Sequence, residues 1–152
     1  MHLSNRLTLM GSLALCLVML TSCGDPIVMI PGKVLSGKEL PPPQFWKNVP
    51  DTIQVETNLA DSYSINIWGV GIAEDLYIAT GEDGTKWSAF IDQNPDVRVR
   101  IDKNIYNLTA ILINQNEERE KVIAAYITKY DVDKDGNWLQ TGLIFRLDRL
   151  SK

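Results

Sequence analysis

Apolar and polar residues alternate with a period of two along most of the chain after Thr52. In the first such stretch Ile53, Val55 and Thr57 alternate with polar neighbours, which is the pattern of a strand with one buried face. The sequence predicts six strands, at residues 52–58, 63–72, 75–80, 97–101, 105–114 and 143–150. Short turns separate most of them, so hairpin connections are expected.

Two stretches instead repeat apolar residues at helical spacing. Trp87, Phe90 and Ile91 fall at i, i+3 and i+4 between a glycine-containing turn and an Asn-Pro stop. Residues 117–130 carry two glutamates in the first turn and one apolar stripe, formed by Val122, Ile123, Tyr126, Ile127 and Tyr130. Strands joined by hairpins, with two helices that do not alternate regularly with them, favour a small antiparallel α+β barrel over a parallel sheet.

The first 22 residues have the layout of a secretory signal. Arg6 supplies positive charge, and residues 7–20 form an apolar run that is shorter than a membrane-spanning helix needs. The tetrad Leu20-Thr21-Ser22-Cys23 resembles the lipobox of bacterial lipoproteins. That resemblance implies cleavage after residue 22 and acylation of Cys23 by chains such as palmitate. An ordinary secreted protein and a retained anchor remain the alternatives.

The residue after this cysteine is Gly24, where an inner-membrane retention signal usually has Asp. The resemblance therefore favours the outer membrane, with the protein facing the periplasm. A chain cut at this point contains no histidine, and Cys23 is its only cysteine. Histidine-based catalytic triads, the usual zinc sites and disulfides within the chain are thereby excluded. Its 14 basic and 19 acidic residues give a net charge of −5, which argues against a nucleic-acid partner.

Residues 23–50 are predicted to form the lipid anchor and a proline-rich linker, ahead of a folded domain at 51–152. The segment holds six of the seven prolines, a composition that favours an extended stalk. Phe45 and Trp46 do not suit a free linker. Two alternatives follow for its end: a tail docked on the barrel, or an exposed aromatic hook for a partner.

The segment from Thr80 to Ile101 resembles the FMN-binding split β-barrel superfamily. Thr80 ends the third predicted strand, Lys86 and Trp87 open the helix, and Asn94-Pro95-x-Val97 leads into the next strand. The superfamily includes pyridoxamine 5'-phosphate oxidase-like proteins and deazaflavin-dependent nitroreductases. The resemblance implies a six-stranded antiparallel split β-barrel with two helices, a homodimer with the cofactor site at its interface, and hydride or electron transfer.

The resemblance also suggests which residues hold a cofactor, FMN or a deazaflavin. It implies that Thr80 and Lys86 bind the phosphate, assisted by backbone N–H groups of Gly84, Thr85 and Lys86 at the helix start. The other candidates are Trp87 beside the isoalloxazine ring, and Arg98 or Arg100 as a second cation. Each candidate also has a purely structural interpretation: Lys86 as a solvated lysine, Trp87 as a core tryptophan, and Arg98 and Arg100 as arginines on the solvent-exposed face of a strand.

Several features argue against a bound flavin. Glu82 and Asp83 lie beside the proposed phosphate and would repel it. The chain also lacks the arginine-dense strand that many superfamily members use. An exported chain would have to acquire its cofactor outside the cytoplasm. The alternative is an envelope binding or scaffold protein that kept the barrel, lost the cofactor, and meets a small molecule or an envelope protein.

The stretch from Asp131 to Gly136 matches the first half of a calcium-binding loop. Asp131, Asp133 and Asp135 supply oxygens at alternate positions before the glycine, but the twelfth position is Gly142 instead of glutamate. A weak calcium site and a simple acidic turn are both consistent with this pattern. No catalytic residue and no substrate follow from the sequence.

Overall fold

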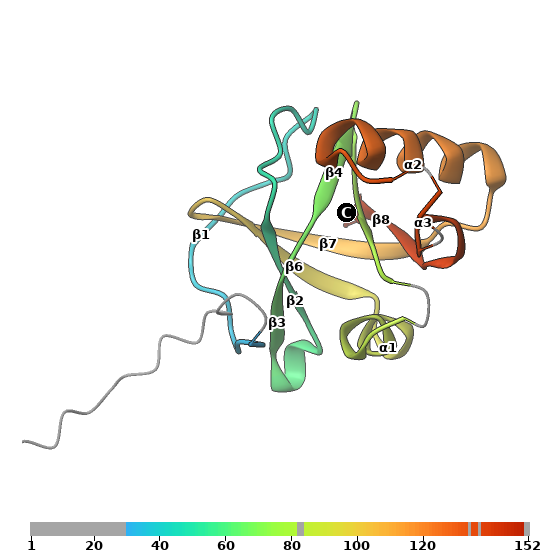
Figure 1. The fold of residues 1–152 in the computed structure, drawn as a ribbon. Helices are drawn as coiled ribbons and strands as arrows, with labels where there is room; N and C mark the ends of the chain where they lie inside the picture. Colours follow the sequence, from blue (N-terminus) through green and yellow to red (C-terminus); the bar gives the residue numbers. More distant parts are fainter. Residues whose placement is uncertain (1–29, 82–83, 134, 137, 151–152) are drawn as a thin grey trace, which may run out of the picture.

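The computed structural model describes residues 30–81, 84–133, 135–136 and 138–150 (Figure 1). The predicted signal segment and Cys23 lie outside these described residues. Within them, no helix is both long enough and apolar enough to cross a membrane.

The described chain forms one curled sheet with two main helices. The strands are β1 (Lys38–Glu39), β2 (Ile53–Thr57), β3 (Tyr63–Ile67), β4 (Gly69–Ile72), β5 (Asp75–Ala79), β6 (Asp96–Ile101), β7 (Asn104–Leu112) and β8 (Ile144–Arg149). The helices are α1 (Lys86–Gln93), α2 (Asn116–Tyr130) and the single turn α3 (Trp138–Thr141), with a 3₁₀ turn at Leu59–Asp61.

The order of strands makes the sheet a barrel. Neighbours follow the path β3-β2-β6-β7-β8-β5-β4 and are all antiparallel, while β1 adds to β7 in parallel. The two outer strands, β3 and β4, are successive halves of one stretch of chain. The two edges of the sheet are therefore joined directly through Trp68, and the sheet is curled. Figure 1 shows the curled sheet.

The α+β antiparallel barrel predicted from the sequence is confirmed, but the count of six strands is wrong. The described residues hold eight strands, because the stretch predicted as one strand at 63–72 breaks at Trp68 into β3 and β4. The other additional strand, β1, comes from the segment predicted as linker. Its two residues pair with the start of β7.

Side chains from the last turns of α2 hold the break at Trp68. The Tyr126 hydroxyl donates a hydrogen bond to the Trp68 carbonyl at 3.1 Å. The Gly69 N–H donates to the Tyr130 hydroxyl oxygen at 3.0 Å, and the Lys129 ammonium donates to the Gly69 carbonyl at 2.8 Å. Burial lowers the pKa of Lys129 and raises the pKa of Tyr130 to about 12. The bend is therefore fixed by hydrogen bonds to its own backbone.

Alternation along the strands separates two hydrophobic cores. Leu76 and Ile78 of β5 point into the barrel, where Trp87 and Ile91 of α1 pack against them, whereas Tyr77 points outward. The outer core lies beneath α2 and contains Val70, Tyr77, Ile113, Val122, Ile123, Tyr126 and Ile144. The apolar faces predicted for the two helices are thus confirmed, and each helix covers a different side of the sheet.

Residues 30–50 lie along the barrel. Leu35 and Trp46 are buried, and backbone hydrogen bonds join Gly32 to Ser64 of β3 in both directions. Trp46 takes the docked position that was one of the two predicted alternatives, while the neighbouring Phe45 is exposed. The described part of the proline-rich segment is therefore packed against the domain.

Replacing Gly69 by alanine tests whether the bend requires a glycine. A Cβ at this position would lie 2.7 Å from the Ile53 Cδ1 atom, so overpacking should cost about 1–3 kcal/mol of unfolding free energy. A Cβ at Gly81 would meet no atom within 4 Å, which makes Gly81→Ala the matched control. Urea unfolding would measure both variants. Equal midpoints for the two would show that the space beside Ile53 accepts the added methyl group and that the bend does not require a glycine.

Candidate functional site: a groove where the barrel splits

The bend at Trp68 changes the neighbour with which the chain pairs. Strand β3, before the bend, pairs with β2, and β4, after it, pairs with β5. Gly69 pairs with Ile78 of β5, whereas Ile67, two residues earlier, pairs with Ile53 of β2. The end of β5 stays with β8, where Ala79 pairs with Ile144. Strand β3 and the end of β5 therefore diverge, and a groove lies between them.

Two adjoining cavities make up this groove, with volumes of about 590 and 360 Å³. Both are lined by Asn66, Ile67, Ala79, Thr80 and Gly81. The larger cavity extends to Thr52 and Trp68, and the smaller one to Ile30, Tyr63 and Lys86. Because the two cavities adjoin along these five shared residues, we call them together the split groove.

Lys86 supplies the positive charge at one end of the split groove. Its ammonium lies 5.0 Å from the ring centroid of Tyr63 and 5.7 Å from that of Phe90, within cation–π range. No carboxylate within the described parts of the chain pairs with it. The carboxylates predicted to oppose a phosphate, Glu82 and Asp83, lie outside those parts. The rings of Tyr63 and Phe90 thus hold the Lys86 ammonium in position.

The start of α1 is fixed by a capping box. The Thr85 hydroxyl accepts from the Ser88 N–H at 3.4 Å, and the Ser88 hydroxyl accepts from the Thr85 N–H at 2.9 Å. Gly84, with φ of +74°, donates its N–H to the Gly81 carbonyl at 3.2 Å. Of the three backbone donors that the sequence suggested for a phosphate, those of Gly84 and Thr85 therefore bond within the protein. The Lys86 N–H is the remaining one.

Thr80 lines both cavities, but its hydroxyl has partners in the backbone. It donates to the Gly81 carbonyl at 2.7 Å and accepts from the Leu143 N–H at 2.9 Å. The Thr80 N–H in turn donates to the Leu143 carbonyl. The residue therefore ties the end of β5 to the segment ahead of β8, and its hydroxyl has no proton left to donate to a ligand.

Trp87 belongs mainly to the barrel core. It is 5% exposed, and its ring centroid lies 5.8 Å from that of Phe145 on β8. It contributes to the lining of the smaller cavity. The interpretation of Trp87 as a core residue therefore describes its position better than the interpretation of Trp87 as a wall beside a flavin ring.

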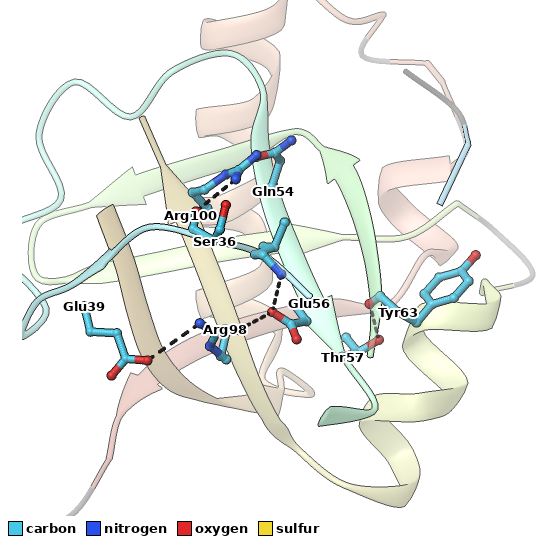
Figure 2. Close-up of polar contacts among 9 residues, drawn as sticks. Ser36, Glu39, Gln54, Glu56, Thr57, Tyr63, Arg98 and Arg100 are labelled. Carbon is cyan, nitrogen blue, oxygen red and sulfur yellow. Dashed lines mark hydrogen bonds and ion pairs between the residues drawn. The ribbon is translucent and has the colours of Figure 1, made fainter. Parts of the chain in front are cut away.

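Arg98 lies outside the residues that line the split groove. Its guanidinium binds the carboxylate of Glu56 at 2.6 Å and reaches Glu39 at 3.6 Å (Figure 2). Glu56 is 1% exposed, and the same oxygen accepts the Leu35 N–H at 3.0 Å. Arg98 thus fastens the N-terminal segment to β2.

Arg100 makes the same kind of link two residues further along β6. Its guanidinium binds Gln54 of β2 and donates to the Ser36 carbonyl at 3.0 Å (Figure 2). Both arginines predicted as a second phosphate-binding cation therefore hold the N-terminal segment against the sheet.

A separate ion network ties α2 to the sheet. Glu118 accepts hydrogen bonds from the Tyr77 hydroxyl at 3.0 Å and from Arg146 at 2.8 Å. Arg146 also binds Asp148, which follows it on β8. Burial raises the pKa of Tyr77 and of the nearby Asp75. These groups line none of the cavities described above.

The acidic loop after α2 forms a local turn. The Asp133 carboxylate accepts from the Asp135 N–H at 3.0 Å, and its carbonyl accepts from the Gly136 N–H at 3.0 Å. Asp131 is the left-handed residue that ends α2. Among the described residues, no three acidic, histidine or cysteine side chains gather as a metal site. The contacts observed are those of an aspartate-rich turn.

No protein-family model and no curated protein matches this sequence. Solved structures do resemble it. A putative pyridoxamine 5'-phosphate oxidase from Listeria innocua superposes with a TM-score of 0.54 at 13% identity, over 67% of this chain and 86% of that one. An FAD-binding protein from Mesorhizobium loti gives 0.52 at 11% identity, over 67% and 83%. The chain has their fold. At these identities the likeness shows the fold alone.

The split-barrel fold also occurs in a protein described by another activity. HutZ, a heme storage protein from Vibrio cholerae, gives a TM-score of 0.50 at 14% identity, over 67% of this chain and 83% of that one. The predicted resemblance to split-barrel proteins is therefore supported at the level of fold.

Sequence analysis missed Trp68 and Asn66 as lining residues of the split groove. The alternating pattern continues through them, so they were placed within one unbroken strand. The available signal was Gly69, because a glycine inside a strand pattern often marks a bend.

Replacing Arg98 by alanine should destabilise the protein by about 3–5 kcal/mol, because it leaves the buried Glu56 carboxylate without its charge partner. Replacing both Arg98 and Glu56 by leucine should lower the free energy of unfolding by less than Arg98→Ala does, because no buried charge is left unpaired. The matched control is Lys33→Ala, which removes an exposed ion pair with Asp61 and should cost at most about 1 kcal/mol. Chemical unfolding measures all three, and similar losses for Arg98→Ala and Lys33→Ala would refute the prediction.

Proposed function

We propose that this protein is a lipid-anchored split-barrel protein of the bacterial envelope that binds a flavin-type cofactor, FMN or a deazaflavin, in the split groove. The observation that carries the proposal is the pair of adjoining cavities, one lined by Lys86 and the other by Trp68. A cation at one end and an aromatic residue at the other suit a ligand with a phosphate and a ring system. The split-barrel fold, found in an FAD-binding protein, supports it.

The residues present fit such a ligand in part. The Lys86 ammonium and the Lys86 N–H would hold the phosphate at the start of α1, where the helix dipole favours negative charge. Ile67 and Ala79 offer apolar walls between the two ends of the groove. A bound flavin would supply hydride or electron transfer, while the chain would bind it, orient it and exclude water.

A second candidate function is cofactor-free binding of a small molecule or an envelope protein. The observation in its favour is that Thr80 and Arg98 are engaged within the protein. Lys86 is then the single charged side chain among the groove residues proposed for a phosphate. The two candidates differ in whether the groove binds flavins selectively.

The lipid anchor is part of the proposal. Cys23 is seven residues ahead of Ile30, which lines the smaller cavity, so the connection spans at most about 25 Å. Acylation of Cys23 would therefore hold the split groove close to the membrane, in the periplasm at the outer membrane. Formation of a homodimer stays a prediction from the resemblance.

Titration of the mature chain with FMN, followed by quenching of flavin fluorescence, tests the cofactor. Lys86→Ala should weaken FMN binding by about tenfold, because it removes the charge partner of the phosphate. Lys103→Ala is the control, since this exposed lysine of the β6–β7 turn lines no part of the groove. A wild-type chain that does not quench FMN would favour the cofactor-free candidate.

Cys23→Ala should abolish incorporation of labelled palmitate in a bacterial host and release the protein from the membrane fraction. Cys16→Ala leaves the proposed acylation site intact and should retain both the label and the membrane location. Continued labelling of the Cys23→Ala chain would show that the anchor has been assigned to the wrong residue.

A further inference from the structure

Residues 30–39 carry the two most exposed large apolar side chains in the described part of the chain. Ile30 is 67% exposed and Val34 is 58% exposed, whereas the neighbouring Leu35 is buried. Figure 1 shows this segment along one flank of the barrel, on the side away from α2. Single exposed apolar residues are common on protein surfaces, so exposure alone does not mark a binding face. The position of these two residues in the chain gives their exposure a meaning.

Backbone hydrogen bonds fix the segment that carries these side chains. Gly32 bonds to Ser64 of β3 in both directions, and the Leu35 N–H donates to the Glu56 carboxylate at 3.0 Å. The Lys38 N–H donates to a carbonyl oxygen of the β6–β7 turn at 2.8 Å. Ile30 and Val34 are therefore held on the surface of the domain, and a partner that binds them need not order the segment first.

The flank lies close to the proposed site of acylation. Cys23 is seven residues ahead of Ile30, so the connection between them spans at most about 25 Å. Acyl chains on Cys23 would place the start of that connection at the membrane surface. A short tether makes contact between the flank and the lipid effectively intramolecular, so that a small apolar surface suffices.

The charges on this flank suit a lipid surface better than those of the chain as a whole. Its basic residues are Lys33, Lys38, Arg98, Arg100 and Lys103, and its acidic ones are Glu39, Glu56, Asp61 and Asp102. Within the described ranges, the ammonium groups of Lys38 and Lys103 pair with no carboxylate. The flank is therefore not acidic, although the mature chain carries a net charge of −5. Anionic lipid head groups attract lysines held near them.

We propose that the flank formed by residues 30–39 lies on the membrane surface, with Ile30 and Val34 inserted among the lipid head groups. This inference rests on the lipid anchor of the proposed function and adds a second contact, made by the folded domain itself. Ile30 and Pro31 also line the smaller cavity, as Lys86 does. Docking therefore turns the Lys86 end of the split groove toward the bilayer.

The test uses the acylated mature chain in vesicles that contain phosphatidylglycerol, with a spin label on one introduced cysteine. Acylation consumes the thiol of Cys23, so the introduced cysteine carries the only free thiol. Val34→Cys should place the label about 5–10 Å into the head-group region, where collisions with oxygen rise and collisions with a water-soluble nickel chelate fall. Glu120→Cys, at an exposed residue of α2, is the matched control and should stay open to the nickel chelate.

A second substitution tests whether the apolar side chains make the contact. Adding Ile30→Asp should return the label at position 34 to water, because a carboxylate enters lipid at a high cost. Leu112→Asp places the same charge at an exposed apolar residue near the other end of β7 from the residues that β1 joins. It should leave the label at position 34 shielded from the nickel chelate.

The outcomes separate docking from anchoring. If the chain stays with the vesicles and the labels at positions 34 and 120 are equally open to the nickel chelate, docking is overturned and the anchor stands. A label at position 34 that is shielded from oxygen as well as from the nickel chelate is covered by protein, which also overturns docking. A mature chain that carries no acyl group and leaves the membrane fraction overturns both claims.

Discussion

The split groove depends on one constraint, the bend that α2 imposes on the chain at Trp68 and Gly69. The Lys129 ammonium donates to the carbonyl oxygens of Val49, Pro50 and Gly69 at 2.7–2.8 Å, so each of its three protons has a backbone partner. Tyr130 meets the same glycine through its hydroxyl. Without these bonds, the partly buried backbone at the bend would lack partners. The bend directs β3 toward β2 and opens the gap from β5.

The two sides of β3 and β2 consequently serve different purposes. On one side the N-terminal segment covers the sheet, and the buried Glu56 carboxylate there is neutralised by Arg98 of β6 and accepts the Leu35 N–H. On the other side the end of β5 moves away and leaves the split groove, where Lys86 rests on aromatic rings. Positive charge within the barrel is therefore divided between holding the fold and facing the groove. This division explains why a phosphate would meet fewer cations here than the sequence suggested.

The sequence predicted the helices and strands more reliably than the segments that pack against them. Helical spacing placed Trp87 on the buried face of α1, and alternation placed Arg98 on the polar face of its strand. A periodic pattern states which face a residue occupies and does not reveal what covers that face. The cover over Arg98 comes from residues more than fifty positions earlier in the chain, whose prolines indicated a linker. The glycine at position 69 was a local signal of the bend, but the groups that fix the bend lie on α2, about sixty residues away, and could not be read from the pattern.

Amide hydrogen exchange of Gly69 tests the role of the bend most directly. Its N–H donates to the Tyr130 hydroxyl, so Tyr130→Phe removes the acceptor without removing the ring that backs Trp68. The account predicts that this substitution accelerates exchange at Gly69 and along the neighbouring groove wall, Asn66 to Trp68, while the β6–β7 amides keep their protection. Unchanged exchange at Gly69, or an equal acceleration throughout the barrel, would contradict the claim that α2 holds the split open.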